Sequence, residues 1–85
     1  MERIEGPVRG HYLAAYTVPS TEGHYGYAKV CAVRPECVWD AALVVLKVAA
    51  GPFSSEASAL ASVLEKAAEE LREASEWQLL WDFAS

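Results

Sequence analysis

The chain has 85 residues, of which 53% are hydrophobic and 22% charged, with a formal net charge of −5 at pH 7. This length fits one domain, residues 1–85, and the hydrophobic content excludes an intrinsically disordered chain. No apolar run approaches the roughly 18–20 residues of a membrane-spanning helix, and the first ten residues lack the apolar core of a signal peptide. We therefore expect a protein of the cytoplasm with no membrane contact.

Two aromatic segments near the start of the chain predict an antiparallel hairpin. RGHYLAAYTV, which stops at Pro19, indicates a strand over about residues 10–18. HYGYAKVCAV, which stops at Pro35, indicates a second strand over about residues 24–34. The intervening PSTEG combines Pro, Ser and Thr with a glycine that tolerates positive φ, so it suits a short turn.

The rest of the chain predicts a third strand and one long helix. LVVLKVAA favours a strand over about residues 43–49, ended by GPF, while residues 35–42 are compatible with either one helical turn or a loop. From residue 55 to about 76, alanine and leucine recur at three- and four-residue spacing, as in an amphipathic helix. Ser54 or Ser55 would cap this helix, and Glu56 would lie favourably at its positive end.

This order predicts an α+β fold in which a three-stranded antiparallel sheet is packed by one long C-terminal helix (β-β-β-α). Along the second strand, the small residues Gly26, Ala28, Val30 and Ala32 share one face, which suits close contact with an alanine-rich helix. The opposite face would then present large and polar side chains. We expect a second surface there, made of Tyr12, Tyr16, Tyr25, Tyr27 and Lys29.

Charge is unevenly placed along the chain and bears on the class of partner. Residues 1–55 carry five basic and five acidic residues, whereas residues 56–85 carry seven acidic against two basic ones. An acidic half repels phosphate backbones and attracts basic proteins. The tyrosine surface would suit stacking of single-stranded nucleic acid. The basic residues are few and scattered along the sequence, so we expect nucleic acid to be an unlikely partner.

The residues that could carry chemistry do not form a recognisable site. His11, His24, Cys31 and Cys37 lack the close pairwise spacing of a zinc site. Cys31 has no evident base or helix N-terminus to activate it, and the helical glutamates resemble a solvated outer face. We expect free thiols, no metal, no cofactor and no catalytic residues, hence a protein that is not an enzyme.

The end of the chain, EWQLLWDFAS, is unusually apolar for a terminus. Trp77, Leu80 and Trp81 continue the helical spacing from Ala74, and Phe83 lies on a neighbouring arc. This segment, residues 77–85, could wrap the domain's own sheet or dock on a second subunit. Trp and other aromatic residues are frequent anchors at protein interfaces, and a small core gains stability from association. We expect a homo-oligomer, most simply a dimer, or another protein partner, with Trp77, Leu80, Trp81 and Phe83 as anchors.

The run from YTVPSTEGHYGYAKV to GPFSSEASALASVLEKA resembles the HicB-type antitoxin fold in outline. Both have a strand, an acidic–glycine turn, a tyrosine-rich strand, a third strand, and then glycine and serine before an alanine-rich helix. The resemblance covers about Tyr12 to Ala74. It implies a partner-binding module with a sheet like that of double-stranded-RNA-binding domains, which can shield a toxin.

Overall fold

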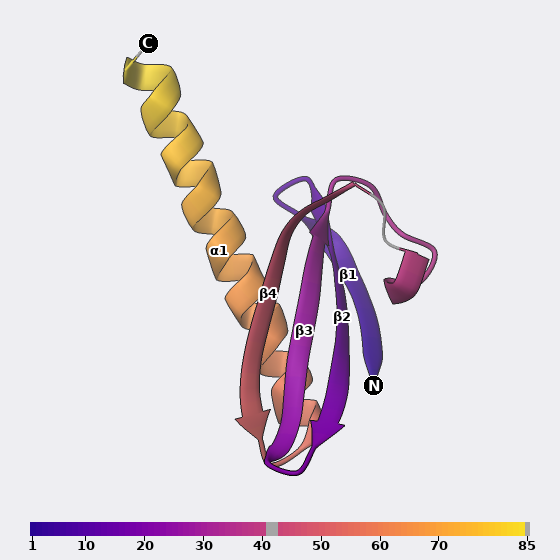
Figure 1. The fold of residues 1–85 in the computed structure, drawn as a ribbon. Helices are drawn as coiled ribbons and strands as arrows, with labels where there is room; N and C mark the ends of the chain where they lie inside the picture. The colour runs from indigo at the N-terminus through magenta and orange to yellow at the C-terminus, as the bar shows by residue number, and fades with distance from the viewer. Residues whose placement is uncertain (41–42, 85) are drawn as a thin grey trace.

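The structure is a computed structural model that describes residues 1–40 and 43–84; for residue 40 and residues 74–84 it describes the backbone alone. The elements are β1 (Glu2–Val8), β2 (His11–Ser20), β3 (Gly23–Cys31), a short 3₁₀ helix η1 (Val38–Asp40), β4 (Val44–Phe53) and α1 (Glu56–Ala84). The strands form one antiparallel sheet in the order β1-β2-β3-β4, and α1 crosses one of its faces (Figure 1). The expected α+β class, with one C-terminal helix on an antiparallel sheet, is confirmed.

The sheet has four strands, and the expectation of three is wrong because β1 precedes the first predicted strand. Its sequence, ERIEGPV, contains charged residues, a glycine and a proline, all of which are uncommon in strands. β1 is an edge strand, however, and pairs only with β2, for example Arg3 with Ala15. Pro7 lies at an irregularity in the ladder between Glu5 and Val8, a position where a missing N–H is tolerated.

β4 and α1 also run further than the sequence suggested, whereas β3 ends at Cys31, before the expected end at residue 34. β4 is the second edge strand and continues through Gly51 and Pro52 to Phe53, beyond the expected end at residue 49. Pro52 can lie in this strand because an edge needs no hydrogen bond on its outer side. Within residues 35–42, which the sequence left open, η1 forms, and residues 41 and 42 lie outside the described part of the chain. α1 continues to Ala84, past the expected end at residue 76.

The main core lies between α1 and the face of the sheet that carries small residues. Ala28 and Val30 of β3 are buried there, as the alternation along this strand predicted. Ala32, expected on the same face, lies beyond the end of β3 and is exposed. The core joins four elements and consists of Leu13, Ala15, Ala28, Val30, Val48, Leu60, Val63, Leu64, Ala67 and Leu71.

Gly26 sets how closely the helix approaches the sheet. A Cβ atom at this position would meet the carbonyl oxygen of Ala59 and come within 2.9 Å of the Val63 Cβ. Only a residue without a side chain fits between β3 and the backbone of α1. The first turn of α1 is fixed by Ser55, whose Oγ accepts a hydrogen bond of 3.1 Å from the Ser58 N–H, so Ser55 is the N-cap.

Because of this contact, we expect Gly26→Ala to destabilise the fold. A methyl group forced against the helix backbone costs about 1–3 kcal/mol, as in other overpacked cores. Chemical denaturation followed by circular dichroism measures the change. Ala61→Ser, on the exposed side of α1, is the control and should stay within about 0.5 kcal/mol of the parent. A Gly26→Ala midpoint equal to that of the parent would show that the helix can move away from β3 without cost.

The N-cap leads to a second expectation. Ser55→Ala removes the acceptor for the Ser58 N–H and should lower the free energy of unfolding by about 1 kcal/mol. Ser54→Ala removes the same hydroxyl one residue earlier, at an exposed position, and should have little effect. Equal losses in the two variants, measured in the same denaturation experiment, would argue against Ser55 as the cap.

Candidate functional site

The face of the sheet opposite α1 carries the tyrosines singled out from the sequence. Residues directly opposite each other in an antiparallel pair share a face. The β2–β3 register pairs Tyr16 with Tyr27, Val18 with Tyr25, Ala14 with Lys29 and Tyr12 with Cys31. All five residues of the expected second surface therefore lie on this face, called the tyrosine face from here on.

Only part of that set is brought together. The rings of Tyr16 and Tyr27 are stacked, with centroids 5.4 Å apart and an interplanar angle of 23°. Tyr12 lies apart from this pair, over Gly6 of β1, where a Cβ would come within 2.8 Å of its ring. Tyr25 lies over Gly51 at the β4 side and donates its hydroxyl proton to Glu22 at 2.8 Å. That hydrogen bond raises the pKa of Tyr25, so the phenol stays protonated.

Trp39 joins the tyrosine pair and was not identified as a site residue from the sequence. It comes from η1, and its indole lies 4.7 Å from the Tyr16 ring, centroid to centroid. Its Nε1–H donates to the Glu2 carboxylate at 2.7 Å, while 61% of the residue remains exposed. The signal in the sequence was a large aromatic residue in a connection, but its position depends on how the connection folds over the sheet.

The connection from β3 to β4 covers one end of the tyrosine face. Val38 is buried with Ala14 and Cys31 in a small second core, against which Ile4, Tyr16 and Val44 also pack. The Lys29 ammonium donates to the Val38 carbonyl at 3.2 Å and lies 5.8 Å from the Tyr16 centroid and 5.9 Å from that of Trp39. These cation–π contacts and the hydrogen bond hold Lys29 at the boundary between the covered and the open part of the face.

The remaining candidate groups show no arrangement typical of catalysis. Burial raises the pKa of the Cys31 thiol, and the nearby Lys29 charge offsets this only in part, so the residue is a poor nucleophile. His11 lies near its own turn, with Nδ1 3.1 Å from the Arg9 carbonyl oxygen. Across the described ranges, no three His, Cys, Asp or Glu residues lie close enough to hold a metal ion.

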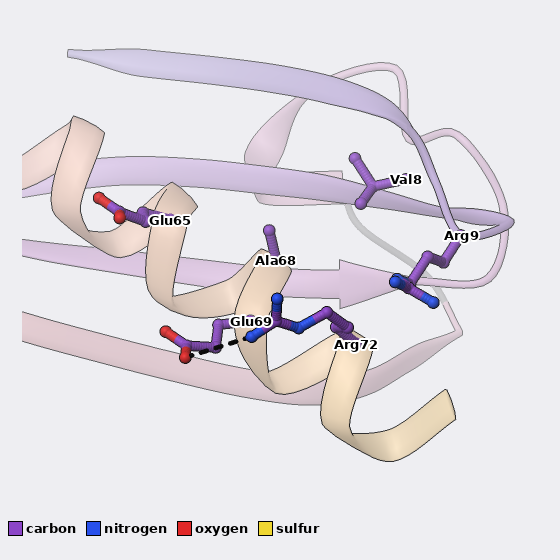
Figure 2. A pocket seen from close by; sticks show the side chains of 6 residues that line it. All are labelled: Val8, Arg9, Glu65, Ala68, Glu69 and Arg72. Atoms are coloured by element: carbon purple, nitrogen blue, oxygen red, sulfur yellow. Dashed lines mark ion pairs between the residues drawn. The ribbon is translucent and has the colours of Figure 1, made fainter. Parts of the chain in front are cut away.

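A shallow groove lies where α1 passes the β1–β2 turn. It has a volume of about 450 Å³ and is lined by Val8, Arg9, Glu65, Ala68, Glu69 and Arg72. Figure 2 shows Arg9, from the turn, and Arg72, from the helix, at the same end of this groove. Arg72 is paired with Glu69 at 3.5 Å. The groove is open and its charges are balanced, so we assign it no chemistry.

The C-terminal part of α1 extends beyond the sheet (Figure 1), and the molecule measures 49 × 25 × 15 Å along its principal axes. The expected anchors Trp77, Leu80, Trp81 and Phe83 belong to this helix, but their side chains lie outside the described part of the structure. Among the helices of the described residues, none is long and apolar enough to cross a membrane.

A search of protein-family models, of curated proteins and of solved structures finds no match for this chain. The resemblance to HicB-type antitoxins therefore stays a prediction from the sequence.

The two cysteines should differ in reactivity. Cys31 is fully buried and the pKa of its thiol is raised, whereas Cys37 is partly exposed. Iodoacetamide at neutral pH should modify Cys37 first in the native protein and reach Cys31 only on unfolding, as followed by intact mass. Cys37→Ser should remove the fast modification. Rapid modification of both thiols in the folded parent would contradict the buried position of Cys31.

Proposed function

We propose that this protein is a non-enzymatic protein–protein association module that forms a homodimer through the C-terminal part of α1. The observation that supports this best is the position of that segment. α1 continues to Ala84 and extends past the end of the sheet (Figure 1), and the sequence from Trp77 to Phe83 is largely apolar. Apolar side chains on a helix that has passed the end of its own sheet need another surface to be buried.

The spacing along α1 puts Trp77 and Trp81 at one margin of the side that faces the sheet. The side of the helix that faces the sheet is marked by its buried residues, which are Ala59, Leu60, Val63, Leu64, Ala67 and Leu71. An α-helix has 3.6 residues per turn, so positions seven and eleven residues after Leu71 fall on that same side. They are Gln78 and Asp82, which are polar. Trp77 and Trp81 lie about 100° from Gln78 and Asp82, and each follows a buried residue, Ala59 or Val63, by eighteen positions or five turns.

Trp77 and Trp81 thus continue one margin of the side that packs on the sheet, at a level where the helix has passed the end of the sheet. Trp77, Leu80 and Trp81 are spaced three and four residues apart and form an apolar stripe. A second copy presents the same stripe, so a two-fold pairing of helices would bury both at once. The segment also carries Glu73, Glu76 and Asp82, whose mutual repulsion would be reduced by salt.

The likeness to HicB-type antitoxins implies the same class of role, the binding of a partner protein. A different, basic partner in place of a second copy would use the same apolar stripe and would be favoured by the acidic residues around it. Salt separates the two cases, because attraction to a basic partner weakens with salt whereas apolar self-association persists or strengthens.

Sedimentation equilibrium over a wide concentration range tests the dimer. The parent should sediment as a dimer at higher concentrations, and Trp77→Ala with Trp81→Ala should shift it to a monomer that keeps its circular dichroism spectrum. Two truncated anchors of this type typically cost at least 2 kcal/mol, so the dissociation constant should rise by about 30-fold or more.

The matched control is Gln78→Ala with Asp82→Ala, which changes two positions of the same segment on the side that follows Leu71. This variant should dimerise like the parent. A parent that stays monomeric at every concentration would contradict the proposal, and so would a tryptophan variant that dimerises as well as the parent.

A further inference from the structure

The fold brings the three lysines of the chain to the β3–β4 side of the sheet, with the Lys29 ammonium directed towards the Val38 carbonyl, Tyr16 and Trp39. Lys29, Lys47 and Lys66 are far apart in the sequence. Lys29 and Lys47 are directly opposite each other in the β3–β4 ladder, and both lie on the tyrosine face. Lys66 reaches the β4 edge from α1, where its ammonium donates to the Ala49 carbonyl at 2.9 Å. Ala49 lies two residues after Lys47 on the same face of β4.

None of the three lysines forms an ion pair within the part of the chain that the structure describes. The ion pairs found there use the N-terminal amine, Arg3 and Arg72 as their cations, and none uses a lysine. Like charges directly opposite each other in a sheet are destabilising, so the Lys29–Lys47 pair has a cost in the unliganded protein. An anion bound beside the two ammonium groups would relieve it.

A row of aromatic rings ends next to the lysines. Trp39 contacts Tyr16, and Tyr16 stacks on Tyr27 across the β2–β3 pair. The next position across the sheet is Ala49, the β4 partner of Tyr27, and this alanine is exposed. The side of the Tyr27 ring turned away from Tyr16 therefore borders a small residue, which leaves room for one more flat ring.

We infer that this edge of the tyrosine face, made of Tyr27, Ala49, Lys29, Lys47 and Lys66, binds single-stranded nucleic acid. A base would stack on Tyr27 above Ala49, and the flanking phosphates would lie among the three ammonium groups. An aromatic ring beside a phosphate is the repeating chemistry of a nucleotide chain. Base–aromatic stacking together with a positively charged track is how open sheets bind single strands.

The shape of the edge favours a strand over a free nucleotide. Small ligands are usually held in concave pockets that bury most of their surface. Three hollows of the structure are lined by other residues, on the β1 side of the sheet and along α1. Tyr27, Ala49 and the three lysines line none of these three hollows, and a surface outside a pocket gains affinity from several successive contacts along a chain. A duplex would not fit because its bases are stacked on one another and cannot reach Tyr27.

The scatter of basic residues along the sequence had suggested that nucleic acid is an unlikely partner, but the register of β3 with β4 and the position of Lys66 bring three of them together. The net charge of −5 arises from residues 56–85, which contain the whole of α1, and this helix packs on the other face of the sheet. A strand would therefore meet Lys29 and Lys47 on the face opposite the acidic helix, and Lys66 at the β4 edge. With three phosphate contacts, the logarithm of the affinity should fall with the logarithm of salt with a slope of about −2.

Fluorescence anisotropy with a labelled oligothymidylate of about eight nucleotides tests the site on the full chain. Binding should be measurable at about 50 mM salt and weaken by 200 mM with the slope given above. Lys47→Gln should weaken binding and make the salt slope less negative by about 0.7. Arg34→Gln removes the same charge at an exposed position after β3 and should leave both values unchanged.

The stacking position has its own variant. Ala49→Tyr places a ring beside Tyr27 and should lower affinity by about tenfold or more, as expected when one base loses its stacking surface. Its circular dichroism spectrum should match that of the parent, because β4 is an edge strand and the position is exposed. Trp77→Ala with Trp81→Ala should bind the oligonucleotide like the parent, so this test is independent of the dimer.

Three results would overturn the inference. The first is no binding of the oligonucleotide at low salt. The second is an equal loss in Arg34→Gln and Lys47→Gln, which would indicate attraction without a site. The third is competition by thymidine monophosphate as effective as that of the unlabelled oligonucleotide, which would assign the edge to a free nucleotide.

Discussion

The close approach of α1 to β3 at Gly26 is the constraint from which the other features follow. With no side chain at this position, the helix backbone at Ala59 lies directly against the strand. The alternation of a strand then fixes both faces at once, because every second residue of β3 points away from the helix. This one helix–strand contact therefore determines both faces of β3. The small residues face the helix, and the opposite face carries Tyr25, Tyr27 and Lys29.

The same constraint separates the molecule into two chemically different sides. The acidic residues of the second half lie along α1, while the aromatic rings and two of the three lysines lie on the far face of the sheet. Lys66 is the exception, since it starts on the helix and reaches the β4 edge. An edge carbonyl bonded to a lysine is also a poor site for strand addition, so this contact helps to keep a neighbouring strand from pairing with β4.

Features of the fold that depend on local sequence patterns could be predicted, whereas features that depend on contacts between distant segments could not. The tyrosine face and the small face follow from local alternation, and both were predicted. β1 was missed because ERIEGPV has weak strand propensity and is held at the edge by backbone pairing with β2, which no local pattern reveals. Trp39 was missed for a similar reason, since its place over Tyr16 depends on the path of the connection from β3 to β4.

The grouping of the lysines shows most clearly what could not be predicted from the sequence. Lys29 and Lys47 become neighbours only through the β3–β4 register, and that register shifts at two irregularities that the sequence does not mark. Lys66 arrives there because Ser55 fixes where α1 begins and Gly26 fixes how closely it packs. Counting charges along a chain therefore underestimates the positive potential that a sheet can concentrate, because pairing, and not proximity in sequence, decides which charges meet.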